Sequence, residues 1–255
     1  MRARTPTANV IIPAYNAAKT IARTVASAVA ARQFCIAAGL AADIEIIVVD
    51  DCSTDATADV VGAAGSRVRL IRNAVNRGPG FSRNEGVRQS SGGFLFFLDA
   101  DDVFFPNHIH ACLQALLGDD TLGYVFTRLK IDMPMHPDWP PSLDESCPIN
   151  FCVRRVWHEM IQGFAEEPDF TTYRTEDTLY RACLRRLVKH KKLDVETCEQ
   201  FVSDGNALDR QREKFANSKA TWQSKGIDDG FRMTPQMEEV ALARLAHVAK
   251  LLGQV

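Results

Sequence analysis

Three carboxylates, Asp99, Asp101 and Asp102, follow directly on the apolar run Phe94-Leu95-Phe96-Phe97-Leu98. Carboxylates at the end of a buried strand are costly to place without a compensating cation. Strand geometry would turn Asp99 and Asp101 to one face of the sheet. Two oxygen ligands at this spacing suit Mg²⁺ or Mn²⁺, which keeps further positions open for substrate phosphates. The alternative is an acidic turn in which Asp102 or Asn107 caps the helix that follows.

Two other polar segments also come after predicted buried strands. Residues 9–13 are typical of a short buried strand, and residues 44–49 of a second one with nearly continuous β-branched side chains. In open α/β sheets, ligands bind beyond the carboxyl ends of the strands. We therefore expect three polar segments to converge in one cleft: Pro13–Asn16, Asp50–Asp55 and Asp99–Asp102.

The first hundred residues alternate between predicted strands and helices. Strands are expected at 9–13, 44–49, 68–71 and 94–98. Helices are expected at 17–31, in a segment that begins at 56, and in a segment that follows the loop at 76–80 and ends at 89. This alternation predicts an α/β fold with a doubly wound, mostly parallel sheet flanked by helices. The later elements are expected to be a helix at 106–117, a strand at 124–131, a Pro-rich loop at 133–148, a strand at 150–153, and helices at 155–161, 175–190 and 235–252.

The composition is that of an ordinary globular protein. The chain has 255 residues, of which 46% are hydrophobic and 24% charged, and its formal net charge is -2. This balance does not favour a nucleic-acid partner. No apolar run approaches the roughly 20 residues that cross a bilayer. The seven cysteines include no CxxC pair, which argues against a zinc site and favours a reducing cytoplasm.

The polar segments occur together with two basic motifs in a recognisable order. The set is Val10-Ile11-Ile12-Pro13-Ala14-Tyr15-Asn16, Ile47-Val48-Val49-Asp50-Asp51-Cys52-Ser53-Thr54-Asp55, Asn76-Arg77-Gly78, Arg83-Asn84 and Leu98-Asp99-Ala100-Asp101-Asp102. In this order and strand context, the set resembles a family-2 glycosyltransferase of the GT-A fold. The resemblance covers residues 9–105 well and the rest of the chain loosely.

The resemblance implies a nucleotide site at the first two polar segments. Pro13, Tyr15 and Asn16 would line the pocket, with the flat ring of Tyr15 against a base. Asp51, alone or with Asp50, would accept a hydrogen bond from the base, because an unpaired buried acceptor is unfavourable.

A simpler role is open for the two aspartates, since either could cap the following helix, as Ser53 or Asp55 also could. The resemblance further implies that Arg77 or Arg83 approaches the diphosphate, where a cation offsets concentrated negative charge.

The resemblance also implies a divalent cofactor, Mn²⁺ or Mg²⁺, and a catalytic base. Asp101 would bind the metal directly, and Asp99 would bind through a metal-bound water or a ribose hydroxyl. Asp177 would take the proton of the acceptor hydroxyl, with Glu176 as the second candidate. The family's usual aromatic after this acidic pair is replaced by Thr178. The alternative is that both acids only complement the dipole of a helix start.

On this interpretation the enzyme moves one sugar from a nucleoside-diphosphate sugar, with UDP favoured, to an acceptor hydroxyl with inversion. Residues 1–105 would form the nucleotide-sugar half, 106–232 a smaller α+β acceptor and base half, and 233–255 a C-terminal helix. His136 and Trp139 are candidates for contact with an acceptor sugar, and Arg210 or Arg212 for the phosphates.

Two other classes remain open, a sugar-nucleotide nucleotidyltransferase and a non-catalytic nucleotide-sugar-binding protein. Nucleotidyltransferases carry a glycine-rich first loop, which Pro13-Ala14-Tyr15-Asn16 is not. The C-terminal helix, with apolar residues at helical spacing, allows peripheral attachment to the inner face of a membrane.

Overall fold

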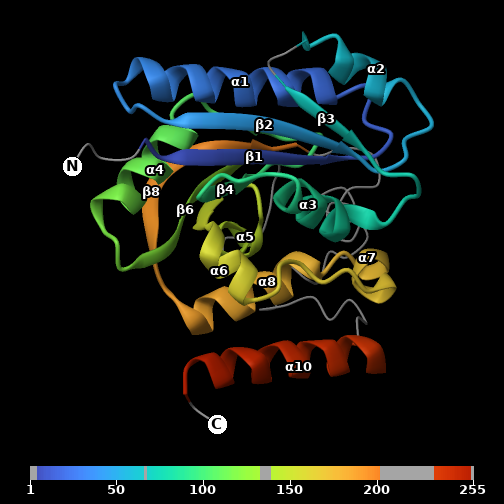
Figure 1. The fold of residues 1–255 in the computed structure, drawn as a ribbon, viewed down its shortest axis with the longest axis vertical. Coiled ribbons are helices and arrows are strands. Elements are labelled where there is room, and N and C mark those ends of the chain that lie inside the picture. The colour runs from blue at the N-terminus through green and yellow to red at the C-terminus, as the bar shows by residue number, and fades with distance from the viewer. Residues whose placement is uncertain (1–4, 66–67, 133–138, 202–232, 254–255) are drawn as a thin grey trace, which may run out of the picture.

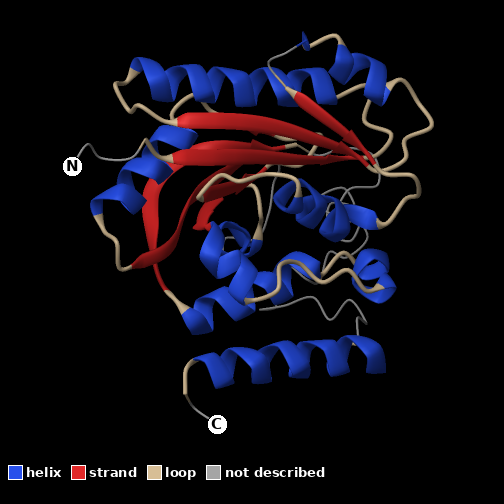
Figure 2. Cartoon of the chain, in the orientation of Figure 1, coloured by secondary structure: helices blue, strands red, loops and turns tan. Residues whose placement is uncertain are grey.

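The computed structural model describes residues 5–65, 68–132, 139–201 and 233–253. The described strands form one curved mixed sheet in the order β3-β2-β1-β4-β7-β6-β8-β5, with helices on both faces (Figure 1). The predicted α/β class with a mostly parallel sheet is confirmed, and Figure 2 shows the layers of helix and strand.

The first half of the sheet is parallel. β1 (Thr7–Ala14) lies between β2 (Asp43–Asp50) and β4 (Phe94–Phe97), and β3 (Arg69–Arg72) pairs with the outer side of β2. The helices that connect these strands are α1 (Ile21–Ala37), α2 (Thr57–Gly62) and α3 (Gly78–Arg88). Each predicted strand and helix of this half is confirmed, with shifts of a few residues at the ends.

The second half contains more elements than the sequence predicted. All its described elements are β5 (Val103–Phe104), α4 (His108–Gly118), β6 (Leu122–Ile131), α5 (Trp139–Ser146), β7 (Phe151–Arg154), α6 (Arg155–Met160), α7 (Pro168–Tyr173), α8 (Glu176–Leu187), β8 (Lys189–Gln200) and α10 (Pro235–Leu251). β7 is antiparallel to β4 and β6, whereas β8 is parallel to β6.

Two predictions in this half are wrong. The second part of the expected loop at 133–148 is the helix α5, which accommodates Pro140 and Pro141 because prolines are tolerated in the first helical turn. The helix expected at 175–190 ends at Leu187, and Val188 is extended, so that residues 189–200 form β8. The elements β5, α5, α7 and β8 were not predicted.

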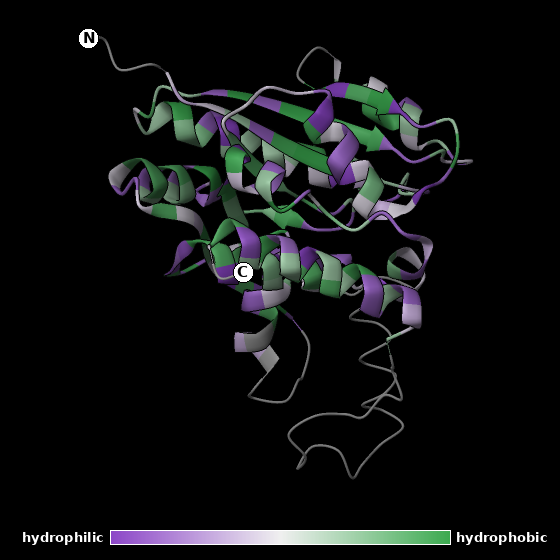
Figure 3. Cartoon of the chain, turned by 60° about the horizontal axis from the view of Figure 1, so that its bottom comes forward, coloured by the Kyte–Doolittle hydropathy of each residue, from purple (hydrophilic) through white to green (hydrophobic). Residues whose placement is uncertain are grey.

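The central strands β1, β2 and β4 are buried on both faces, which explains their continuous apolar sequences. Val10 and Ile12 of β1 belong to the core with α1 and α4, whereas Ile11 lies on the other face, in the core with α3 and α8, and α10 packs on α8. Figure 3 shows the hydrophobic residues concentrated along the central strands. None of the described helices combines the length and the apolar character that a membrane crossing would need.

Candidate active site

The polar segments after β1 and β2 lie against each other, as the sequence predicted. The backbone N–H of Asn16 donates to the hydroxyl of Ser53 at 2.9 Å, and the side-chain oxygen of Asn16 accepts from the N–H of Thr54 at 2.9 Å. Asn16 has a φ of 48°, a left-handed conformation that asparagine tolerates better than most residues. These bonds hold the two strand-end loops in one surface.

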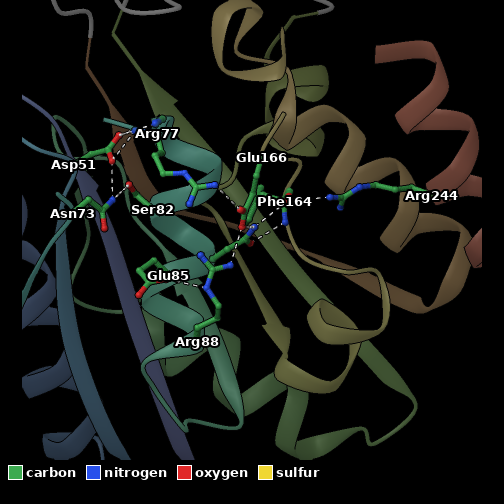
Figure 4. Close-up of polar contacts among 11 residues, drawn as sticks. Asp51, Asn73, Arg77, Ser82, Glu85, Arg88, Phe164, Glu166 and Arg244 are labelled. Carbon is green, nitrogen blue, oxygen red and sulfur yellow. Dashed lines mark hydrogen bonds and ion pairs between the residues drawn. The ribbon is translucent and has the colours of Figure 1, made fainter. Parts of the chain in front are cut away.

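Asp51 is buried and holds the start of α3. Its carboxylate accepts the backbone N–H groups of Arg77 at 3.1 Å and Gly78 at 2.7 Å, and the side-chain amide of Asn73 at 2.7 Å (Figure 4). It therefore complements the positive end of α3 rather than capping α2, the helix that follows it in the chain.

Asp50 and Asp55 make the other carboxylate contacts at the end of β2. Asp50 is buried, pairs with Arg72 at 3.1 Å, and accepts the N–H of Ser53 at 3.1 Å. Asp55 accepts the N–H of Thr57, the first residue of α2, at 3.0 Å. Of the capping alternatives that the sequence left open, the structure thus shows Asp55 at the start of α2.

The acidic turn, residues 99–102, is not a continuation of β4. That strand ends at Phe97, and the N–H of Asp102 donates to the carbonyl of Asp99 at 3.1 Å. The prediction that strand alternation places Asp99 and Asp101 on one face is therefore wrong, because the chain turns there.

Asp102 and Asn107 do not cap a helix by their side chains. Asp102 is buried, and one carboxyl oxygen accepts the N–H of Phe201 at 2.9 Å. Burial, and then the charges of Asp101 and Asp99, raise the pKa of Asp102 well above its ordinary value. Asn107 occupies the N-cap position of α4, but its side chain makes no capping hydrogen bond.

Arg83 joins the two halves of the site. One guanidinium nitrogen lies 2.7 Å from Asp99 of the acidic turn, and the other lies 2.8 Å from Glu176 at the start of α8. The ring of Phe164 lies below the guanidinium, 5.1 Å from its central carbon. Burial disfavours the positive charge, but Asp99 and Glu176 outweigh it and raise the pKa of Arg83. The guanidinium of Arg83 is therefore charged although it is buried.

The acidic pair on α8 has two different environments. Glu176 is buried and engaged with Arg83, whereas Asp177 is only partly buried and accepts the N–H of Thr178 at 2.6 Å. Burial, and then the charge of Glu176, raise the pKa of Asp177 to about 7, although Arg83 opposes the shift. Asp177 can therefore exchange a proton near neutral pH.

The structure describes some of the remaining predicted residues. Pro13 is buried within β1, and the side chain of Tyr15 is 53% exposed. Arg77 is exposed, with its guanidinium 3.6 Å from the ring of Phe81. The predicted residues His136, Arg210 and Arg212, and the side chain of Trp139, lie outside the described part of the chain.

Sequence reasoning did not single out Glu166. Its carboxylate accepts from Arg88 at 2.8 Å and from Asn84 at 2.7 Å, and it lies 3.8 Å from Arg77 (Figure 4). No motif marks this residue, because Glu166-Glu167-Pro168 resembles an ordinary helix start. Only the approach of α3 to the segment after α6 gives Glu166 its partners.

The charges of the site are not balanced. Among the described residues, three carboxylates, Asp99, Asp101 and Glu176, lie beside two cations, Arg83 and Arg23, and Arg23 donates to the carbonyl of Asp101 at 2.7 Å. In the described chain, no three or more Asp, Glu, His or Cys side chains form a preassembled metal site. A Mg²⁺-type centre needs only one or two carboxylates when phosphates supply the other oxygens. The excess negative charge and the oxygen donors of the acidic turn therefore fit a divalent cation.

The sequence matches known glycosyltransferases over most of its length. The family model "Glycosyl transferase family 2" matches residues 9–190. The chain is 38% identical over 112 residues to the succinoglycan biosynthesis protein ExoO of Rhizobium meliloti, covering 44% of this chain and 30% of that protein. It is 28% identical over 243 residues to the chondroitin synthase of Pasteurella multocida, covering 82% of this chain and 24% of that protein. The chain thus spans less than a third of each of these two relatives.

Solved structures share the fold at low sequence identity. The structure of Staphylococcus aureus TarS residues 1–349 with UDP-GlcNAc superimposes with a TM-score of 0.68 at 18% identity, covering 95% of this chain and 66% of that one. The mannosyltransferase PcManGT of Pyrobaculum calidifontis, with GDP-Man and Mn²⁺, gives 0.62 at 20% identity, covering 98% and 75%. The predicted GT-A fold is confirmed, and the chain belongs to glycosyltransferase family 2.

Proposed function

We propose that this chain transfers a single sugar from a nucleoside-diphosphate sugar to an acceptor hydroxyl with inversion. One observation carries the proposal: Arg83 connects Asp99 of the acidic turn to Glu176 of α8 at 2.7 and 2.8 Å. This contact brings the proposed donor-side and acceptor-side acidic groups into one site, and transfer between two substrates depends on such close positioning.

The donor site would lie over the loops after β1 and β2. Pro13, Tyr15 and Asn16 would border the base, together with Asp50 and Asp51. Because its carboxylate already accepts two backbone N–H groups, Asp51 would also set the position of Arg77 and Gly78 at the start of α3. Arg77 is exposed and therefore available to a diphosphate. The similarity to TarS with UDP-GlcNAc supports the choice of a uridine nucleotide.

A divalent metal, Mn²⁺ or Mg²⁺, would be held by Asp101, with Asp99 acting through a metal-bound water or a ribose hydroxyl. The oxygen donors of the acidic turn support this assignment, as does the Mn²⁺ in the PcManGT structure. When bound, the metal neutralises the diphosphate as it leaves.

Asp177 would act as the base that removes the proton from the acceptor hydroxyl. A raised pKa near 7 matches its proton affinity to neutral conditions, and its partial exposure leaves it open to an acceptor. Glu176 is less suited, because it is buried and paired with Arg83. Direct attack by the activated hydroxyl on the face opposite the diphosphate inverts the anomeric centre.

The decisive experiment measures release of nucleoside diphosphate from a panel of UDP- and GDP-sugars with Mn²⁺, with and without simple sugar acceptors. We expect release from a UDP-sugar that increases with an acceptor and stops in Asp177→Asn. Tight nucleotide binding without release from any donor would identify a non-catalytic binding protein instead. A cytoplasmic location and peripheral membrane association stay predictions.

A further inference from the structure

The guanidinium of Arg244, in the middle of α10, binds a short segment of backbone after α6. Nη1 donates to the carbonyl of Gly163 at 2.6 Å and, more weakly, to those of Ile161 and Gln162 at 3.4 Å each. Nη2 donates to the carbonyl of Phe164 at 3.1 Å. One side chain of α10 thus holds four consecutive carbonyl groups of the segment 161–164.

The conformation of this segment is unusual. Gln162 and Gly163 are consecutive residues with left-handed φ angles of 66° and 67°. A non-glycine residue in that region is disfavoured unless its surroundings stabilise it. A Cβ on Gly163 would lie 2.5 Å from the side-chain oxygen of Asn84, so the segment also packs closely on α3. Arg244 on one side and α3 on the other therefore define where the segment lies.

Phe164 connects the segment 161–164 to the active site. Its N–H donates to the side-chain oxygen of Asn84 at 2.9 Å, and its carbonyl accepts from Asn84 at 3.0 Å and from Arg244 (Figure 4). Its ring stacks on Tyr180 of α8, with centroids 4.0 Å apart and planes at 8°, and lies 5.1 Å below the guanidinium of Arg83. The aromatic ring beneath Arg83 thus belongs to the backbone segment 161–164, which Arg244 of α10 binds.

We infer that Arg244 is a positioning residue for the reaction: through the carbonyls of 161–164 and the ring of Phe164, it fixes Arg83 between Asp99 and Glu176. This inference rests on the proposed glycosyl transfer. It assigns α10 a part in catalysis although Arg244 contacts neither of the two acidic groups. Displacements of about 1 Å at a reacting centre are enough to lower a rate by roughly a hundredfold.

His247 offers a matched control on the same helix. Its Nε2 lies 2.8 Å from the carbonyl of Met160, so it also joins α10 to the end of α6, but it does not bind residues 161–164. If α10 mattered only as a covering helix, Arg244→Met and His247→Ala would have similar effects.

The test compares kcat and donor KM of the full chain for wild type, Arg244→Met, Arg244→Lys and His247→Ala, well below each thermal midpoint. We expect kcat to fall about tenfold or more in Arg244→Met. The fall should exceed any change in KM, be smaller in Arg244→Lys, and stay within about twofold in His247→Ala. A normal kcat in Arg244→Met, or equal losses in Arg244→Met and His247→Ala, overturns the inference.

A double-mutant cycle with Phe164→Leu separates positioning from general loss of stability. If Arg244 acts through Phe164, the losses in kcat/KM of the two single variants will not multiply in the double variant, since residues in one network are not additive. Fully multiplicative losses would show two independent roles and contradict the inference. If wild type transfers no sugar, the proposed function itself has failed, and binding of UDP by calorimetry will show whether the donor site survives.

Discussion

Arg83 and Glu176 are 93 residues apart in the chain, yet their guanidinium and carboxylate groups are 2.8 Å apart and both side chains are buried. The second nitrogen of the same guanidinium holds Asp99 at 2.7 Å. Burying an arginine is unfavourable unless it is well paired, and here two carboxylates pair with it. The contact couples the folding of the two halves to the assembly of the active site.

Replacing Arg83 should therefore destabilise the protein strongly. In Arg83→Met, the carboxylate of Glu176 stays buried without its partner, which costs about 3–5 kcal/mol in comparable cases. The measurement is the free energy of unfolding from denaturant titration.

The exposed arginine Arg128, which lies 3.3 Å from Asp194, provides the control. Exposed ion pairs contribute about 0–1 kcal/mol, so Arg128→Met should change little. If the two variants lose equal stability, the pair between Arg83 and Glu176 is not the internal contact described above.

Replacing Asp177 should stop transfer and spare nucleotide binding. Loss of a positioned general base lowers rates by roughly 10²–10⁴-fold, and Asp177→Asn keeps the shape of the side chain. The measurements are initial rates of transfer and calorimetric binding of UDP. A normal transfer rate in this variant would return the role of base to Glu176.

The raised pKa of Asp177 predicts how activity depends on pH. The base must be ionised to accept a proton, so kcat/KM should rise as the pH increases through about 7. The effect on stability has the opposite sign. Because the folded state holds the proton more tightly than the unfolded chain, this contribution is present at low pH and lost as the pH rises through about 7. Asp177→Asn should therefore be more stable than wild type at pH 8 and similar to it at pH 4.

Most of the first half of the fold could be predicted from the sequence because its strands are covered on both faces. Such strands are continuous apolar runs, and the polar residues that follow them mark the ligand edge. β8 could not be found this way. Its sequence, KHKKLDVETCEQ, is mostly exposed, and only Thr197 and Cys198 are buried. Its place depends on pairing with β6, which lies more than 60 residues earlier in the chain.

The contacts between the site residues also could not be predicted from the sequence. Motifs marked Asp99, Arg83 and Glu176 separately, but nothing in their local spacing showed that the guanidinium of Arg83 joins the other two. The sequence predicts strand alternation across Asp99 and Asp101, whereas the chain turns there, and the buried Asp102 contacts Phe201, which lies 99 residues later.

The dependence of UDP binding on Mn²⁺ should require Asp101. We expect UDP to raise the thermal midpoint of wild type more with Mn²⁺ than with EDTA, and Asp101→Ala to remove that difference while the midpoint without ligand stays close to wild type. A ligand stabilises the folded state in proportion to its binding, so the thermal shift measures the affinity. Asp120→Asn is the control, since Asp120 is 94% exposed and pairs with Arg154. Undiminished Mn²⁺ dependence in Asp101→Ala would remove Asp101 from the metal site.

The close approach of α3 to α8 should make Gly80 irreplaceable. A Cβ on Gly80 would lie 2.5 Å from the backbone carbonyl of Ala165 and 3.2 Å from Cγ of Glu176, and backbone cannot move aside cheaply. Overpacking of this kind costs about 1–3 kcal/mol, and α3 would shift away from the start of α8. We therefore expect Gly80→Ala to lower both the free energy of unfolding and kcat. Gly62→Ala on α2 meets nothing within 4 Å and should stabilise by at most about 1 kcal/mol. An unchanged kcat in Gly80→Ala would mean that the spacing between α3 and Glu176 does not control the reaction.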